Sequence, residues 1–100
     1  MIIQQLSVFV ENKSGRLFEV MQILGDANIN VSALSIADTS DYGIVRLIVS
    51  NPDEALRLLK DQQFSVQKTP VIGCKVPNTP GGLKTLLTYL AEDNISIEYM

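Results

Sequence analysis

The stretch that decides the fold is residues 6–24, which read LSVFVENKSGRLFEVMQIL. Its first six residues alternate apolar with mostly polar side chains, a period of two that predicts a β-strand. Residues 12–15, NKSG, interrupt the alternation. Leu17, Val20, Met21 and Leu24 then recur with spacings of three and four residues, which predicts an amphipathic helix over residues 15–27. A strand followed directly by a helix is therefore the local unit.

The same unit occurs again 66 residues later. Residues 6–34 align with residues 72–100 without a gap, and the identical pairs include Gly15 with Gly81 and Asn28 with Asn94. Glycine and asparagine are the residues that most readily turn the chain at the ends of a helix, and Asn28 predicts a left-handed exit from the first helix. We interpret the match as an internal duplication, with one domain over residues 1–69 and a partial, truncated second domain over residues 70–100.

Further elements follow the first unit. Residues 29–38 are rich in strand formers, with a slip in the alternation near Ala33 that predicts a bulge. Turn residues over 39–43 predict a hairpin to a strand over 44–49. Asn51 and the following Pro52, Asp53 and Glu54 form a helix-start signature, which predicts a helix over residues 52–62. A last strand is predicted over residues 64–69.

The order β-α-β-β-α-β predicts an α+β, ferredoxin-like fold, in which an antiparallel sheet carries both helices on one face. The partial second copy is predicted as β-α-β, with strands over 71–76 and 95–100 and a helix over 80–93. The face of the sheet without helices is then left to meet solvent or another molecule.

Composition excludes several function classes. The chain has 8 Lys and Arg against 11 Asp and Glu, no His and one Cys, which argues against binding a nucleic-acid backbone and against a zinc site or an internal disulfide. Without His the usual general base is missing, so we expect no enzyme, no catalytic residues, no metal and no cofactor. Cys74 aligns with Val8 and is expected to be buried. The sequence shows neither a secretion signal nor a membrane-length apolar run, so we expect a cytoplasmic protein that binds no membrane.

The two strand–helix junctions are the candidate binding sites. A helix start presents free N–H groups and a positive dipole end, which attract a carboxylate, and glycine lets a ligand approach the backbone. The same residues can also serve only to shape a turn, and that alternative stays open. The candidate residues are Asn12, Lys13, Ser14, Gly15, Arg16 and Leu17 in the first junction, and Asn78, Thr79, Pro80, Gly81, Gly82 and Leu83 in the second.

These junctions carry a resemblance to a known family. The pattern Asn-x-Pro-Gly-x-Leu between a strand and an amphipathic helix resembles that of ACT domains. Residues 78–83 keep the whole pattern, whereas Ser14 replaces the proline in the first copy. The resemblance covers residues 2–69 and, in part, 71–100, and the arrangement is similar to small stand-alone proteins made of tandem ACT domains.

The resemblance implies a non-catalytic regulatory module. ACT domains pair side by side, as homo-oligomers or tandem pseudo-dimers, and bind a small ligand, commonly an amino acid, at the seam. Many members place a second polar contact where this chain has Asn30, and Ser96 is its counterpart in the second copy. Such a module would signal to amino-acid metabolism, for example through a partner enzyme.

Two alternative functions are compatible with the same residues. A ligand-free dimerisation or protein-interaction module would use the junctions as turns only. An enzyme on the same scaffold is the weaker alternative, because the Gly-x-x-Gly-x-x-Phe-Arg run of acylphosphatase-like chemistry and any Cys-x-x-Cys pair are missing from the sequence.

Overall fold

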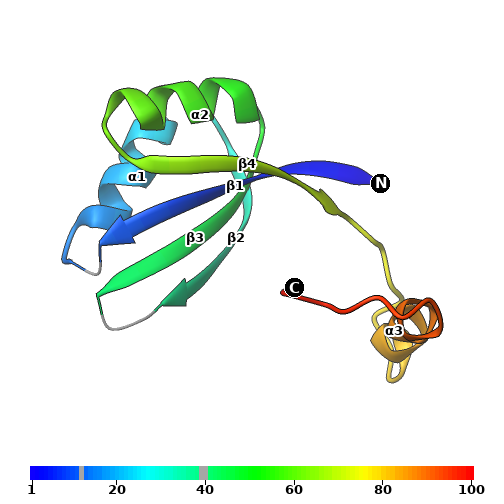
Figure 1. Cartoon of the computed structure of the whole chain (residues 1–100). Coiled ribbons are helices and arrows are strands. Elements are labelled where there is room, and N and C mark those ends of the chain that lie inside the picture. The colour runs from blue at the N-terminus through cyan, green and yellow to red at the C-terminus, as the bar shows by residue number, and fades with distance from the viewer. Residues whose placement is uncertain (12, 39–40) are drawn as a thin grey trace.

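The structure is a computed structural model that describes residues 1–11, 13–38 and 41–100. From here on, the first unit means residues 1–72. It forms one four-stranded sheet with the strand order β2-β3-β1-β4, in which every neighbouring pair is antiparallel (Figure 1). The elements are β1 (Ile2–Glu11), α1 (Arg16–Asp26), β2 (Val31–Asp38), β3 (Tyr42–Val49), α2 (Pro52–Asp61), β4 (Ser65–Ile72) and α3 (Gly82–Glu92). The predicted α+β, ferredoxin-like arrangement of the first unit is confirmed.

The core lies between one face of this sheet and the helices α1 and α2. Alternate residues of β1 and β3 point inward, so that Leu6 pairs with Leu47 and both are fully buried. They belong to a single apolar cluster that also contains Leu24 of α1 and Leu59 of α2. Because both helices join the same cluster, they cover the same face of the sheet, and the opposite face carries no helix of the first unit.

Local signals in the sequence set the element boundaries. The Asn51 side-chain oxygen accepts a hydrogen bond from the Glu54 backbone N–H over 3.3 Å, with Pro52 as the first helical residue, so the predicted start of α2 is confirmed. The register between β2 and β3 shifts between Val31 and Ala33, where a bulge was expected. The predicted hairpin turn falls partly on residues 39 and 40, which lie outside the described residues.

The strands predicted for the second copy are not formed. Val71 and Ile72 are the end of β4 and pair with Ile3 and Ile2, so β4 runs past the expected domain boundary at residue 69. Residues 73–81 and 95–100 contain no strand. A strand requires a neighbour for its backbone N–H and C=O groups, and no described strand lies alongside these segments. For the same reason Cys74 is exposed, contrary to the expectation that it is buried.

The repeated segments nevertheless have the same backbone conformation. Gly15 and Gly81, which precede α1 and α3, have φ angles of 86° and 84°. Asn28 and Asn94, which follow the two helices, have φ angles of 59° and 56°, so the left-handed helix exit predicted at Asn28 is confirmed. This equivalence supports the internal repeat, while a second domain over residues 70–100 stays a prediction.

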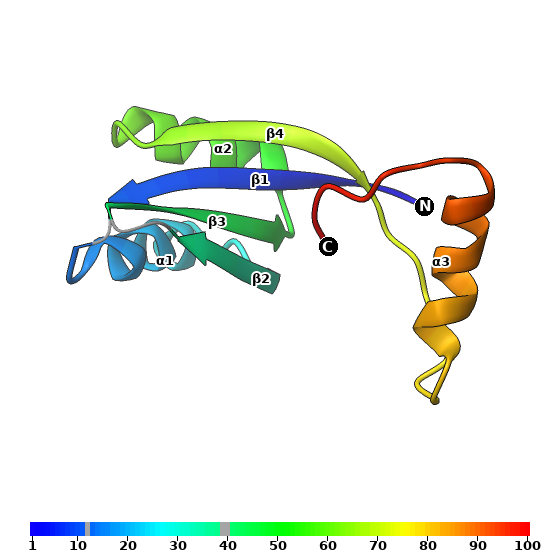
Figure 2. The same ribbon diagram turned by 60° about the horizontal axis from the view of Figure 1, so that its bottom comes forward.

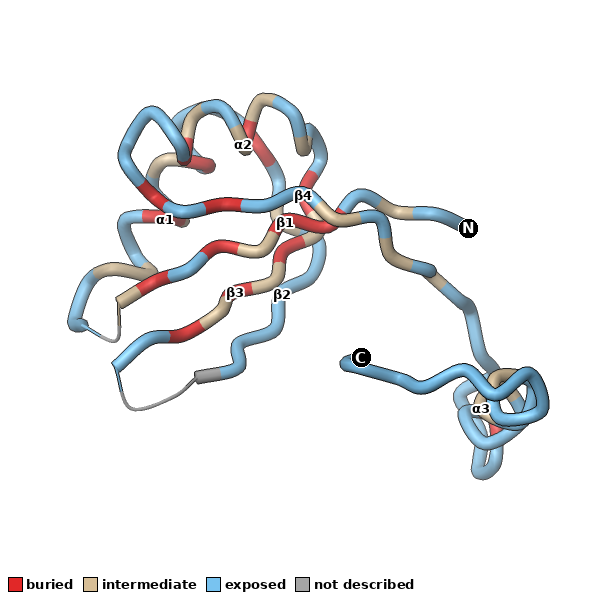
Figure 3. Tube along the Cα trace, in the orientation of Figure 1, coloured by how far each residue is buried: buried red, intermediate tan, exposed pale blue. Residues whose placement is uncertain are grey.

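The chain after β4 lies beside the first unit. Figure 2 shows α3 standing apart from the sheet, and the segment of residues 95–100 returning toward it. We call this segment the tail. Figure 3 shows that buried positions are concentrated in the first unit, whereas the tail is exposed along its length. In the part of the chain that the structure describes, no helix combines the length and apolar character needed to cross a membrane.

Candidate functional site

The first strand–helix junction is shaped by its glycine. Gly15 is the residue before α1 and has a left-handed backbone, a conformation that side-chain-bearing residues other than Asn and Asp adopt only with strain. A Cβ atom at Gly15 would meet nothing within 4 Å, so the backbone angle, and not crowding, requires glycine here. The Gly15 carbonyl accepts the Glu19 backbone N–H over 3.0 Å and thereby starts the helix.

A hollow of about 220 Å³ lies beside this junction. We call it the junction hollow. It brings together residues from four elements and the loop between two of them, namely Val10, Glu11, Lys13, Leu17, Ile36, Gly43 and Val45. The Lys13 ammonium and the Glu11 carboxylate are joined by a salt bridge of 3.2 Å, and both side chains remain partly exposed. The hollow is therefore an apolar space with one neutral ion pair in its lining.

Two of the predicted binding residues, Lys13 and Leu17, line this hollow, and Ser14 and Gly15 belong to the same junction. Asn12 lies outside the described residues. The structure thus has a hollow beside the first predicted junction. Sequence reasoning missed Ile36 and Val45, because their contribution depends on how β2 and β3 pair with β1.

Arg16 is engaged elsewhere. Its guanidinium donates to the Glu19 carboxylate over 2.7 Å and lies over the Phe64 ring, 4.7 Å from the ring centre. It does not belong to the lining of the junction hollow. Because it is paired with Glu19 and lies over Phe64, the position of Arg16 fits a role in fastening the start of α1 over the core.

The second junction has a different local environment. A Cβ atom at Gly82 would lie 2.2 Å from the Pro77 carbonyl oxygen, which explains why glycine stands where the first copy has Arg16. Asn78, Thr79 and Pro80 are exposed. The Gly81 carbonyl accepts hydrogen bonds from both the backbone N–H and the hydroxyl of Thr85.

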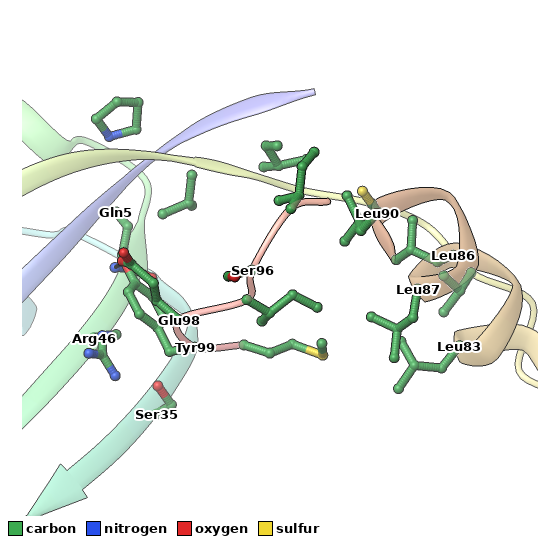
Figure 4. A pocket seen from close by; sticks show the side chains of 18 residues that line it. Gln5, Ser35, Arg46, Leu83, Leu86, Leu87, Leu90, Ser96, Glu98 and Tyr99 are labelled. Atoms are coloured by element: carbon green, nitrogen blue, oxygen red, sulfur yellow. Dashed lines mark hydrogen bonds between the residues drawn. The ribbon is translucent and has the colours of Figure 1, made fainter. Parts of the chain in front are cut away.

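A larger hollow of about 630 Å³ lies between α3, the tail and the helix-free face of the sheet. Figure 4 shows Leu83 and three further leucines of α3 on one side of it, and a group of polar side chains from the sheet and the tail on the other. Two predicted binding residues, Leu83 and Ser96, line it. The polar group, which sequence reasoning missed, consists of Gln5, Ser35, Arg46, Glu98 and Tyr99.

The two junctions do not meet within one chain. They lie at opposite ends of the molecule in both views (Figures 1 and 2), and the two hollows share no lining residue. Asn30 precedes β2, at the end of that strand remote from the first junction, and its backbone N–H donates to the Ser50 hydroxyl over 3.0 Å. A seam that joins two such junctions would therefore need a second copy.

Neither the titratable side chains nor the potential metal ligands among the described residues form a further site. No group of three or more potential metal-ligating residues occurs among them. The Arg57 guanidinium, mainly through its hydrogen bond, lowers the pKa of Glu54, but this pair lies on the exposed side of α2 and not at either hollow.

Comparisons with known proteins agree with this architecture. A family model described as an ACT domain pair matches residues 1–100. The crystal structure of protein BT0572 from Bacteroides thetaiotaomicron is 52% identical with a TM-score of 0.95, and the match covers 99% of this chain and 69% of that chain. No curated protein matches the sequence.

More distant structures share the fold alone. The regulatory subunit of aspartate kinase from Thermus thermophilus, in a ligand-free form, is 16% identical with a TM-score of 0.69, over 96% of this chain and 73% of that one. The ACT domain from the GTP pyrophosphokinase of Chlorobium tepidum is 13% identical with a TM-score of 0.52, over 69% of this chain and 100% of that one.

Proposed function

The chain belongs to the ACT domain family, and from this premise we propose that it is a non-catalytic regulatory module that binds an amino acid in the junction hollow. ACT domains are regulatory, ligand-binding modules. The observation that carries the proposal is the coincidence of a hollow with the predicted junction, since Lys13 and Leu17 both line it. A carboxylate at its rim would lie near the start of α1, where the helix dipole favours negative charge.

The edge of the sheet beside the hollow supports a seam between copies. β2 is an edge strand, and Leu34 and Ile36 on its helix-side face are 50% and 53% exposed. An unpaired edge with exposed apolar side chains favours pairing with another strand. If two copies pair through antiparallel β2 edges, the start of one strand lies beside the end of the other, which would bring Asn30 of a second copy toward the junction hollow.

Regulation then follows from ligand-dependent pairing. An amino acid that contacts both copies binds the paired arrangement better than separate copies, and it shifts the equilibrium by no more than this difference in affinity. A partner enzyme of amino-acid metabolism that recognises one arrangement would receive the signal.

The second candidate is a ligand-free association module. The exposed Leu34 and Ile36 on an open edge favour it, because they would be covered by pairing alone. In this case the junction residues would only shape the turn before α1.

Thermal unfolding with each common amino acid separates the two candidates. A ligand at a hundredfold excess over its Kd stabilises the folded state by about 2.7 kcal/mol, so we expect one or a few amino acids to raise Tm. The D-enantiomer of each active amino acid is the matched control and should have little effect. If millimolar concentrations of every amino acid leave Tm unchanged while light scattering shows a dimer, the association module is the better description.

A further inference from the structure

We propose that the amino acid bound in the junction hollow is one with an aliphatic side chain, an inference that rests on the proposed function. Four of the side chains around the hollow are aliphatic, those of Val10, Leu17, Ile36 and Val45, while Gly43 adds no side chain. Val10 and Val45 are 6% and 2% exposed, so they form a fixed wall of the core and not a mobile surface.

The size of the hollow agrees with a small ligand. At about 30 Å³ per water molecule, 220 Å³ holds roughly seven waters. It is smaller than the ~300–1,000 Å³ that drug-sized ligands occupy. A side chain of two to four carbons fits within it while the α-ammonium and α-carboxylate remain at the rim.

The charges in the lining agree with a ligand whose side chain is neutral. Among the side chains that the structure describes, Glu11 and Lys13 are the ionisable ones that line the hollow, and they form one pair with no net charge. The α-ammonium and α-carboxylate of an amino acid can each face the group of opposite sign. An Asp, Glu, Lys or Arg side chain would instead carry an additional charge against valine, leucine and isoleucine, which is unfavourable without a partner.

A polar neutral side chain would fit less well for the same reason. Among the residues that the structure describes at the hollow there is no Ser, Thr, Asn, Gln or Tyr side chain, so a ligand hydroxyl or amide directed toward the aliphatic wall of Val10, Leu17, Ile36 and Val45 would face no polar side chain of that wall. A hydrogen-bonding group that loses water without finding a partner weakens binding. Each methylene buried against the wall should, in contrast, strengthen binding about fourfold.

The test is a series of ligands that differ by one methylene each, namely alanine, 2-aminobutyrate, norvaline and norleucine. Calorimetric titration of the full chain should give a Kd that falls about fourfold per methylene until the hollow is full. Serine, aspartate and lysine should bind at least tenfold more weakly than norvaline.

Two matched pairs of variants locate the effect. Ile36→Ser should flatten the methylene dependence, whereas Leu34→Ser, on the same face of β2 with nearly the same exposure but outside the hollow, should preserve it. Lys13→Gln should weaken every member of the series by the same factor without changing the methylene dependence. Lys84→Gln, on α3, should leave all affinities unchanged.

The outcomes distinguish the inference from the function on which it rests. If serine, aspartate or lysine binds more tightly than norvaline, the aliphatic assignment is wrong and amino-acid binding stands. If the methylene dependence survives Ile36→Ser but is lost in Leu34→Ser, the ligand lies outside the junction hollow. If no amino acid binds, the proposed function fails together with the inference.

Discussion

The Gln5 side-chain amide donates a hydrogen bond to the Tyr99 hydroxyl oxygen over 3.0 Å, between residues that are 94 positions apart in the chain. Gln5 lies on β1 and is a buried polar residue, 8% exposed. The Arg46 guanidinium on β3 lies 3.7 Å from the centre of the Tyr99 ring. Through these two contacts the tail docks on the helix-free face of the sheet, so this face is partly covered by the chain itself.

Replacement of Tyr99 should release the tail. Tyr99→Ala removes both the hydrogen bond and the cation–π contact, each of which contributes about 1 kcal/mol to holding the tail. We expect a larger radius of gyration in small-angle scattering and lower heteronuclear ¹⁵N NOE values for residues 95–100. Tyr99→Phe, which keeps the ring over Arg46, should have an intermediate effect.

Tyr89→Ala is the control, because Tyr89 is 64% exposed on α3 and does not line the larger hollow. Tyr89→Ala should keep the wild-type radius of gyration and NOE values. Equal radii and NOE values in Tyr99→Ala and wild type would show that the contact does not hold the tail.

The two glycines of α1 and its junction should respond to alanine with opposite signs. Gly15→Ala forces a side chain into a left-handed backbone, which costs about 1–2 kcal/mol of folding stability. Gly25→Ala lies within α1, where a Cβ meets nothing within 4 Å, and should stabilise by up to about 1 kcal/mol. The repeat already carries alanine at the equivalent position, Ala91.

Urea unfolding measures both changes on the same scale. A stability for Gly15→Ala equal to or above that of the wild type would mean that the junction relaxes to another backbone conformation.

Removal of the cap at the start of α2 should destabilise the first unit. Asn51→Ala leaves the Glu54 backbone N–H without its side-chain acceptor and should lower the free energy of unfolding by about 0.5–2 kcal/mol. Asn51→Asp keeps an acceptor and adds a negative charge at the helix start, so it should remain within a few tenths of a kcal/mol of the wild type. Urea unfolding at neutral pH measures the free energy of unfolding of both variants. An equal loss in the two would show that the side-chain acceptor at position 51 does not stabilise α2.

Features that depend on a few adjacent residues were predictable from the sequence. The helix start at Asn51, the left-handed Asn28 and the junction glycine Gly15 each follow from the conformational preferences of a short segment. The spacing of the apolar residues also identified the inward faces of β1 and α1. Residues at that spacing lie on one face of the element, and an apolar face is the one that packs into the core.

Features that depend on the pairing of distant segments were not predictable. Ile95, Ile97 and Tyr99 alternate as in a strand, but no described neighbour pairs with them and the tail remains irregular. The junction hollow could be placed at Lys13 and Leu17, whereas Ile36 and Val45 reach it only through the β2–β3 register. Arg16 is a candidate binding residue by its place in the junction, but the sequence does not show that Glu19 and Phe64 contact it.

The Arg57 guanidinium should make a small, pH-dependent contribution to stability through Glu54. Its hydrogen bond, and to a smaller extent its charge, lower the pKa of the Glu54 carboxyl below the ordinary value of 4.5. Because the folded-state pKa is lowered, the unfolded state binds more protons between the two pKa values. The stabilisation is therefore fully present above the unfolded-state pKa and is lost as the pH falls through the folded-state value.

We expect the Tm difference between wild type and Arg57→Gln to be constant from neutral pH down to about pH 5 and to shrink below about pH 4. The pair is exposed, so the difference should be small and should decrease in added salt. Arg57 also contacts Asp61, and Asp61→Asn serves as the control that removes this second contact alone. A Tm difference that grows as the pH falls would contradict the assigned sign and locate the effect of Arg57 in packing along α2.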